Sequence, residues 1–581
     1  MAIFLSPSSE SSPTMLLAEC GLTAAAVVLS FLAPRLGSAS FARIERVFTS
    51  LACRPALAVL TVGFSAIFLR AILIPLFPAP LPFVPNDFSF LLAADTFAHG
   101  RLTNPMPPMW THFESIDITV QPTYMSMFFP GWGLALGAAQ ALFGHPWIAN
   151  LCFDGLMGAA ICWMLQAWLP PGWALLGGFL AVLRIGLFTY WINTISGGNA
   201  LLDAFSGALV LGALPRLLKT ARIRDGLLMA LGMALLAIAR PYEGLLLCIP
   251  VTVVLVRWIW KGKTRPKTAI LLQRAALPLA LLIAALAWLG LYDYRNFGSP
   301  TTPPYSVARA QYAVASNFAW QSPRPIPVYR HDLIRRYYAG NELIHFQAIH
   351  SLSGYFPSVI GKFEIATLFL AGFALLPPLI MWRRVLLDRR VRLLVICAGM
   401  LAVSLMTESF FIPHYLAPFT AVLYALGLQA MRHLRVRQRG NASVGRTMVR
   451  LLVSLCVLMA TATILQAALP SRGSALPQPG SIRAQIQAKL DALPGGQLIF
   501  VRYLLTHDPS DDWVYNRADF SNAKIIWAWD MGAESNLELM RQYPGRKAWL
   551  VEPDTTPVTL VPYTFSAQTL AGSPNSSGSG S

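Results

Sequence analysis

Apolar residues come in long runs through the first four-fifths of this chain, from near Met15 to near Leu469. Windows of about 20 mostly apolar residues recur along that stretch, and a helix of that length crosses a hydrocarbon core about 30 Å thick. After Leu469 the pattern stops. The sequence therefore predicts a polytopic α-helical membrane protein with about 11–14 spans.

The tail has a different pattern. A Pro/Gly/Ser-rich linker begins at Leu469-Pro470-Ser471. The predicted elements after it are a helix over Ser481–Leu493, strands over Leu498–Tyr503, Lys524–Trp529 and Lys547–Val551, and a helix over Ser535–Tyr543 between the last two strands. That alternation predicts a small C-terminal α/β domain. The last ten residues are low-complexity sequence, which is typical of a flexible tail.

Basic residues gather in short segments between the apolar runs. The five segments are those with Arg35, Arg43, Arg46 and Arg54; Arg216, Lys219, Arg222 and Arg224; Arg257, Lys261, Lys263, Arg265 and Lys267; Arg383, Arg384, Arg389, Arg390 and Arg392; and Arg432 through Arg450. The positive-inside rule predicts that all five face the cytoplasm. The segments expected outside are 79–126, 190–200, 238–243, 293–358, 408–415 and the tail.

The stretch between Gly131 and Pro215 does not fit this threading. Its turn signals, Gly144-His145-Pro146 and Pro170-Pro171-Gly172, leave an odd number of crossings. We therefore expect one extra short or re-entrant helix, broken near Arg184. Broken helices are tolerated at membrane depth only against protein or a water-filled cavity.

The predicted organisation has seven parts. They are N-terminal transmembrane helices (1–78), a large first outer loop with amphipathic helices (79–126), a transmembrane core (127–292), a second large outer loop (293–358), C-terminal transmembrane helices (359–470), an extracytoplasmic α/β domain (471–568) and a flexible tail (569–581).

Composition supports lipid as the solvent. The 581 residues are 55% hydrophobic and 12% charged, with a mean hydropathy of +0.53 and a net charge of +18. In a soluble protein that charge would point to nucleic acid, but here it lies where anionic lipid head groups are, so we assign no nucleic-acid partner. The seven cysteines lie in or beside apolar runs, which excludes a disulfide framework and a CxxC metal pattern. The N-terminus lacks a cleavable signal pattern, so its first apolar run is expected to remain as a span.

A carboxylate lies where the apolar run ending near Phe77 gives way to the first outer loop. Asp87 follows Pro85 and Asn86 at this boundary. In a shielded site such a group can take a proton from an acceptor hydroxyl, so Asp87, with Asn86, is the candidate catalytic position. The same pair can cap an amphipathic helix running to about His99, and the two roles are compatible.

Further polar residues follow in this loop: His112, Glu114 and Tyr124. A long loop with aromatic and proline residues usually folds back to cover something. One His beside one Glu is a weak metal signal, so no metal site is predicted. A sugar-binding role and a plain hydrogen-bond network remain the two interpretations.

Arg240, Tyr242 and Glu243 lie where one predicted span turns into the next at the outer side. A guanidinium offers a planar fork of donors that suits a phosphate. Alternatively, Glu243 neutralises Arg240 as a structural ion pair.

The second outer loop brings Arg295 and Arg309 among several tyrosines, and His414 begins another span. Mixed Arg and Tyr at a membrane face suit a sugar-phosphate or lipid-pyrophosphate ligand, and head-group anchoring explains them as well. His414 could carry a proton or be merely hydrogen-bonded.

Together these features resemble the GT-C superfamily of polyprenyl-phosphate-dependent glycosyltransferases, which contains protein O-mannosyltransferases and aminoarabinose transferases. The resemblance covers the architecture of the whole chain. More narrowly, the chain is similar to a largely uncharacterised set of bacterial membrane proteins that share segments like 88–98, 240–244, 413–415 and 514–519. In the superfamily the first outer loop opens with an acidic pair whose leading Asp is the base. Here the pair reads Asn86-Asp87.

The resemblance implies a bacterial inner-membrane protein whose C-terminal domain lies on the periplasmic side. A lipid-linked sugar would enter from the outer leaflet, and Asp87 would activate the hydroxyl of a protein or glycan acceptor for inverting attack. Arg240 and an arginine of 293–358 would hold the leaving phosphate. No cofactor is implied beyond the polyprenyl-phosphate sugar, and the tail would orient the acceptor or bind a partner protein.

Two other functions compete with this one. A non-catalytic membrane subunit of an envelope complex fits Asn86 at the leading position. A transporter should show two related halves with matching interrupted helices, and the sequence has no such symmetry.

Overall fold

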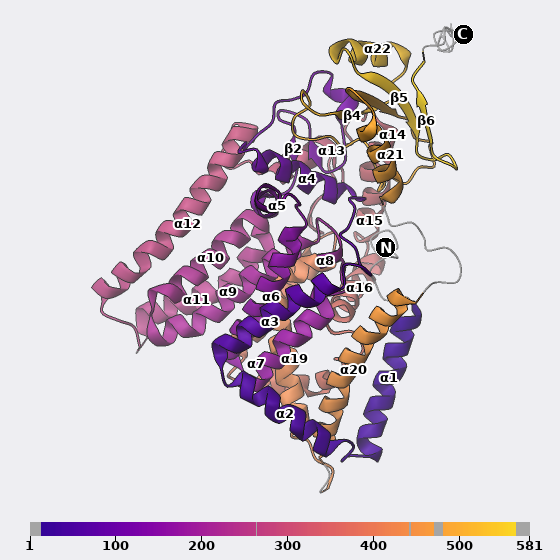
Figure 1. The fold of residues 1–581 in the computed structure, drawn as a ribbon. Coiled ribbons are helices and arrows are strands. Elements are labelled where there is room, and N and C mark those ends of the chain that lie inside the picture. The colour runs from indigo at the N-terminus through magenta and orange to yellow at the C-terminus, as the bar shows by residue number, and fades with distance from the viewer. Residues whose placement is uncertain (1–12, 263, 441–442, 470–479, 565–581) are drawn as a thin grey trace.

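The computed structural model describes residues 13–262, 264–440, 443–469 and 480–564. A long helical bundle carries a small unit with a β-sheet at one end (Figure 1). We call that end of the bundle the sheet end and residues 480–564 the sheet unit. Most of the predicted linker after Leu469 and the predicted flexible tail lie outside the described residues.

Seven helices within the described residues are long and apolar enough to cross a membrane: α1 (Pro13–Leu32), α3 (Pro55–Ile72), α6 (Ile148–Trp168), α9 (Gly198–Thr220), α11 (Pro241–Lys261), α12 (Thr268–Phe297) and α20 (Val444–Ala468). A bent pair, Pro377–Leu387 with α18 (Arg392–Thr407), would make eight. The polytopic helical fold is confirmed. The larger expected number of spans depends on helices that are shorter or less apolar: α5 (Pro130–Phe143), α10 (Ile223–Ala239), α16 (Leu352–Ala371) and α19 (Thr420–Arg435).

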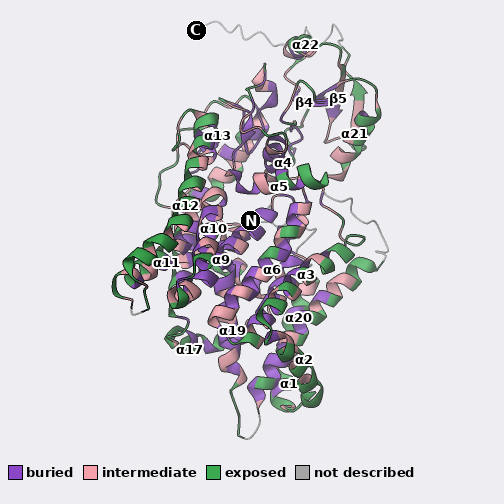
Figure 2. Ribbon diagram, turned by 60° about the vertical axis from the view of Figure 1, so that its left-hand side comes forward, coloured by how far each residue is buried: buried purple, intermediate pink, exposed green. Residues whose placement is uncertain are grey.

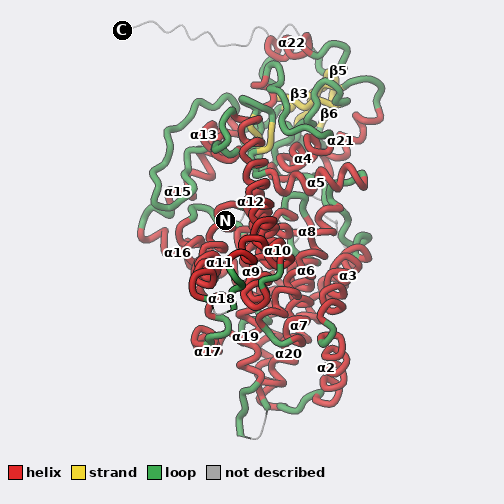
Figure 3. The backbone as a smooth tube through the Cα atoms, turned by 90° about the vertical axis from the view of Figure 1, so that its left-hand side faces the viewer, coloured by secondary structure: helices red, strands yellow, loops and turns green. Residues whose placement is uncertain are grey.

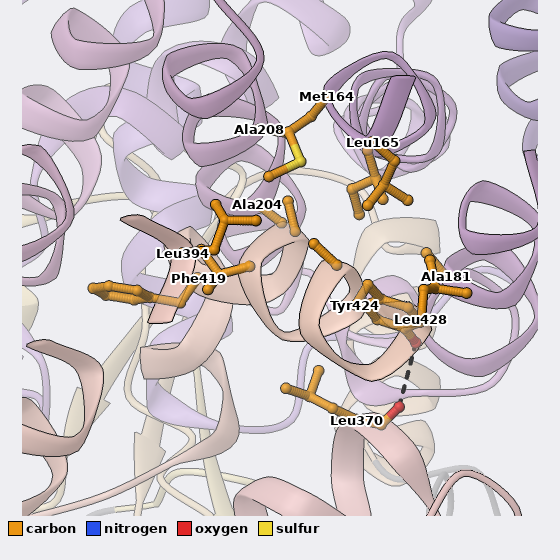
Figure 4. Packing of buried hydrophobic residues seen from close by; sticks show 14 of the residues in the cluster. Met164, Leu165, Ala181, Ala204, Ala208, Leu370, Leu394, Phe419, Tyr424 and Leu428 are labelled. Carbon is orange, nitrogen blue, oxygen red and sulfur yellow. Dashed lines mark hydrogen bonds between the residues drawn. The ribbon is translucent and has the colours of Figure 1, made fainter. Parts of the chain in front are cut away.

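Apolar side chains on the rim of the bundle are exposed because lipid is the solvent there. Only 6% of the most apolar window of α12 is buried, against 72% for α9, and Figure 2 shows the exposed faces of α11 and α12. At the centre, side chains such as Met164, Phe419 and Leu428 interlock (Figure 4). Small residues allow close approach: a Cβ on Gly207 would lie 2.0 Å from the carbonyl oxygen of Pro418.

The break expected near Arg184 is present. Helix α7 (Pro171–Ala181) runs into a five-residue π-helix, η3 (Val182–Gly186), before the one-turn helix α8 (Tyr190–Asn193). At the break, the Arg184 guanidinium reaches Glu19 on α1 at 2.8 Å. The ion pair gives a charged residue at membrane depth a partner, which the bilayer cannot provide.

Basic segments lie at the end of the bundle away from the sheet. Helix α2 (Ser38–Ala52) carries Arg43 and Arg46, and α17 (Trp382–Leu387) carries Arg383 and Arg384. Both helices lie at the foot of the molecule in Figure 3, with the sheet at the top. Two of the five basic segments therefore share one end.

The sheet unit matches the predicted alternation. Strands β3 (Gln497–Val501), β4 (Ile525–Trp529) and β5 (Lys547–Glu552) are parallel in the order β4-β3-β5; in sequence, α21 (Ser481–Ala492) precedes β3, and α22 (Ala533–Gln542) lies between β4 and β5. In the register of the sheet, Val501 lies beside Trp529 and Val551. A fourth strand, β6 (Thr559–Pro562), pairs antiparallel with β5 and was not predicted, because its short run ends in a proline.

Two long loops fill the space between the bundle and the sheet (Figure 1). The first holds α4 (Pro85–Ala98), η2 (Trp110–Phe113) and the short hairpin of β1 (Ile118–Thr119) and β2 (Met125–Ser126). The second holds α13 (Pro304–Tyr312), α14 (Asp332–Arg335), η4 (Arg336–Glu342) and α15 (Leu343–Ala348). Two further short helices are η5 (Pro377–Met381) and η6 (Pro413–Phe419). Every candidate site residue except Arg240, Tyr242, Glu243, Arg295 and His414 lies in these two loops.

Candidate functional site

Asp87 is fully buried in the first turn of α4. Pro85 occupies the first helical position, where its missing N–H would have no helical partner anyway. One carboxylate oxygen of Asp87 accepts from the backbone N–H of Ser196 at 2.8 Å, and the other accepts from that of Phe83 at 3.4 Å. The expected N-cap role is wrong in detail, because Val84 is the N-cap. Asp87 instead reaches back to the backbone before the helix, as in a capping box.

Burial raises the pKa of Asp87 above the ordinary value of 3.8, and the hydrogen bonds from Ser196, Phe83 and Val84 act in the opposite direction. Desolvation penalises the charged form, whereas donors stabilise it. A carboxylate with raised proton affinity, fixed by backbone donors, is suited to accept a proton from a hydroxyl.

The loop that donates to Asp87 continues into α9 and leads to a second polar group. Asn199 donates to the carboxylate of Asp203 at 3.2 Å, and this carboxylate lies 3.4 Å from the guanidinium of Arg240. Both acidic residues on this path, Asp87 and Asp203, are fully buried. A single turn of α9 thus connects the environment of Asp87 with that of Arg240.

Arg240 lies between α10 and α11 and faces two carboxylates. Its guanidinium donates to Glu243 at 2.8 Å, in addition to the contact with Asp203, and its face lies 4.7 Å from the ring centroid of Tyr415. Such geometry is that of a buried ion pair. The structural interpretation of Arg240 and Glu243 therefore has direct support, and a phosphate at this point would meet excess negative charge.

Two other predicted residues lie around the same junction. The Tyr242 hydroxyl is 3.0 Å from that of Thr407. His414 donates its backbone N–H to the Tyr190 hydroxyl at 2.9 Å, and its ring Nδ1 lies 3.2 Å from the same hydroxyl. The structure brings Arg240, Tyr242, Glu243 and His414 together, while Arg295 is exposed on α12.

Arg309 is buried in the second long loop. Its guanidinium donates to Glu342 at 2.5 Å and to the carbonyl of Ala315 at 2.6 Å. Close to this pair is Asp117, a residue that sequence reasoning missed. It is 4% exposed and has a left-handed backbone, with φ of 63°. Burial, reinforced by Glu342 and opposed by Arg309, raises the pKa of Asp117 to about 7.

Tyr305 connects the two arginine environments. Burial raises the pKa of Tyr305, and the positive charges of Arg309 and Arg240 both oppose that shift. Arg324 is a further guanidinium in this region, since the charges of Arg309, Tyr305 and Glu342 act on its pKa, which burial lowers. Its Nη1 is buried and has no hydrogen-bond partner among the described residues. No sequence motif marked Arg324, which lies in a Pro-rich stretch.

The remaining predicted residues lie under the sheet unit. His112 Nε2 is 3.2 Å from the Ser535 hydroxyl, Glu114 accepts from the Tyr312 hydroxyl at 3.0 Å, and Tyr124 donates to the carbonyl of Asn516 at 3.4 Å. His112 and Tyr124 thus form hydrogen bonds between the first loop and the tail, and Glu114 forms one between the first and second loops. Within the described part of the chain, no group of three His, Cys, Asp or Glu side chains could hold a metal ion.

A groove of about 650 Å³ runs along the exposed side of α11. Its walls are mostly apolar, and Arg257 and Lys261 line it near the end of the helix away from the sheet. None of the candidate residues lines it.

The chain matches no protein-family model and no curated protein sequence. Among solved structures, it is similar to ArnT from Cupriavidus metallidurans in the apo state, with 13% identity over 85% of this chain and 93% of that chain and a TM-score of 0.45. The same protein bound to undecaprenyl phosphate gives 13% identity, 87% and 93% coverage and a TM-score of 0.46. The oligosaccharyltransferase of Archaeoglobus fulgidus with Zn and sulfate gives 11% identity, 85% and 67% coverage and a TM-score of 0.48.

These likenesses extend over most of the chain. At this identity they concern the fold, and at TM-scores below 0.5 they assign no chemistry to this chain. The chemistry of the site therefore has to come from its own side chains.

Proposed function

We propose that the protein is an integral membrane glycosyltransferase that moves a sugar from a polyprenyl-phosphate donor to an extracytoplasmic acceptor. The observation that carries the proposal is Asp87: a fully buried carboxylate at a helix start, held by the backbone N–H groups of Ser196 and Phe83, with its pKa raised by burial. The donor class comes from the resemblance described in the sequence.

In this reaction Asp87 takes the proton of the acceptor hydroxyl. The oxygen then attacks the anomeric carbon, the bond from that carbon to the phosphate oxygen breaks, and polyprenyl phosphate leaves with the electron pair. Attack from the face opposite the leaving group inverts the anomeric centre.

The leaving phosphate needs positive charge that is not already neutralised. Arg240 and Arg309 each contact a carboxylate, whereas Arg324 has a buried Nη1 without a hydrogen-bond partner among the described residues. We therefore assign the phosphate contact to Arg324, with Arg309 and Tyr305 beside it. Arg240 then has a supporting role. No cofactor takes part in this scheme.

The sheet end is proposed to face the periplasm, because the basic helices α2 and α17 lie at the other end (Figure 3). The sheet unit would then meet the acceptor, which is a protein or a glycan, and could hold a partner protein.

Replacing Asp87 with Asn tests the base. Asn keeps an acceptor for Ser196 N–H but cannot take a proton, so transfer from a polyprenyl-phosphate sugar in proteoliposomes should fall at least about a hundredfold. Asp508→Asn makes the same change at an exposed position of the sheet unit and should leave the rate unchanged. Equal rates for Asp87→Asn and the parent protein would remove Asp87 from the mechanism.

A non-catalytic membrane subunit is the second candidate. It is favoured by the contacts of His112 and Tyr124 with the sheet unit, by the contact of Glu114 with the second long loop, and by the carboxylates that neutralise Arg240 and Arg309. It predicts that the protein co-purifies with other envelope proteins and shows no transfer with any lipid-linked sugar.

A further inference from the structure

The sheet unit contacts α4, the helix that carries Asp87, through side chains that pack on Phe88. Phe88, the next residue after Asp87, stacks on Tyr515 with ring centroids 4.3 Å apart and planes inclined by 7°. The guanidinium of Arg483, from α21, lies 4.6 Å from the Phe88 ring centroid and 4.6 Å from that of Trp527 on β4. Phe88 is thus contacted by an aromatic ring and by a cation, both from the tail.

The other half of α4 is held from the same segment. The backbone N–H of Ala518 donates to the carboxylate of Asp95 at 2.9 Å. Asp95 lies two turns beyond Phe88, so residues 515–518 contact α4 near both of its ends. The loop that follows α4 is attached as well: Tyr515 donates to the carbonyl of Ile116 at 3.0 Å and Trp529 to that of Glu114 at 2.7 Å.

Arg483 makes polar contacts to the backbone of the same segment. It donates to the carbonyls of Trp513 and Tyr515, both at 3.2 Å, and in the described ranges Asp511 and Asp512 act on it by charge without a hydrogen bond. Burial lowers the pKa of Arg483 to about 10, so it stays charged at neutral pH. Arg483 is partly exposed, and the nearby carboxylates of Asp511 and Asp512 act on its charge without forming an ion pair with it. Its hydrogen bonds and ring contacts therefore fix its position.

We propose that Arg483 is a positioning residue for Asp87: through Phe88 and residues 513–518, the sheet unit fixes α4 and therefore the orientation of the Asp87 carboxylate. The sheet unit would then be required for the geometry of the site, because it holds α4 in place. The two carbonyls that Arg483 contacts belong to the segment that stacks on Phe88, so the cation orders both partners at once.

Hydrogen exchange of the purified full-length protein tests this without any substrate. Arg483→Met keeps the apolar length and removes the cation, and we expect exchange in residues 83–98 to become about tenfold faster while α9 and α20 stay as protected as before. Arg483→Lys keeps a cation between the rings and should restore most of the protection. Arg502→Met changes an arginine of the same unit that is 48% exposed and should have no effect on α4.

Unchanged exchange of residues 83–98 in Arg483→Met would overturn the proposal, as would a loss of protection that extends to α9 and α20. The exchange result does not depend on the proposed function, so the two can fail separately. Where transfer activity is measured, Arg483→Met should lower kcat about tenfold and leave the KM for the lipid-linked donor unchanged, since α4 places the base and does not hold the donor. An increase in KM alone would contradict a role in positioning Asp87.

Discussion

Asp117 combines three features that a protein rarely tolerates in one residue: burial, a left-handed backbone in a residue other than glycine, and a carboxylate beside another carboxylate, Glu342. Its backbone carbonyl accepts from Ser89, two residues after Asp87, and from the N–H of Met127. Strained and desolvated positions of this kind gather at functional sites. Asp117 is therefore the first residue to test after Asp87.

The raised pKa of Asp117 predicts that the folding stability of the protein depends on pH. Its pKa of about 7 lies above the ordinary value of 3.8, so between these values the folded protein keeps a proton that the unfolded chain releases. Folding stability then falls as pH rises through this window, and the loss is complete above about pH 7. The Asp117→Asn variant has no titrating carboxyl group at this position. The thermal midpoint of this variant in detergent should therefore rise relative to that of the parent protein between pH 5 and pH 8. A difference between the two proteins that is the same at both pH values would contradict the raised pKa, and Asp508→Asn is the exposed control.

At the scale of elements, hydropathy and loop charge located most of the structure. The helix from Pro85 to Ala98, the break near Arg184 and three strands of the sheet were all predicted, because each depends on a pattern that is local in the sequence. The residues that these elements contact in the folded chain were not predicted. Ser196 lies 109 residues from the Asp87 that it holds, and no periodicity reports such a contact.

The same reason explains why the contacts of the candidate site residues could not be predicted. His112, Glu114 and Tyr124 were marked because they are polar and lie at membrane level, but a sequence does not distinguish a residue that faces a ligand from one that faces another domain. Arg324 and Asp117 were missed because neither belongs to a motif. What decides their environment is how the loops fold over one another.

The ion pair at the helix break carries its own prediction. Glu19 and Arg184 are 2.8 Å apart, with their side chains 4% and 16% exposed. Glu19→Gln leaves the guanidinium without a counter-charge and should destabilise the protein by about 3 kcal/mol, because a buried charge that loses its partner is not resolvated. The double variant with Arg184→Gln should recover part of that loss. Thermal midpoints in detergent measure both, and a neutral Glu19→Gln would show that the pair does not stabilise the break.

At the scale of the whole molecule, the proposal depends on which end faces the cytoplasm. Cys53 is an exposed cysteine at the end of α2, and Leu505 is a 78% exposed residue of the sheet unit. In intact cells a membrane-impermeant maleimide should modify Leu505→Cys in a cysteine-free background and should spare Cys53 in a variant that keeps only this cysteine. Permeabilised cells should label both. The opposite pattern in intact cells would place the sheet unit in the cytoplasm and remove the basis for a periplasmic acceptor.

Helix α12 is longer than a bilayer requires. Its 30 residues extend about 45 Å at 1.5 Å per residue, whereas the hydrocarbon core is about 30 Å thick. Near its last turn, Asn296 donates to the carbonyl of Leu102 in the first long loop and lies beside Thr123. Most of the helix faces lipid, so its tilt must adjust whenever the membrane thins or swells. A change in lipid acyl-chain length would then change the tilt of α12, and the contacts of Asn296 would pass this movement to the loop that contains Asp87.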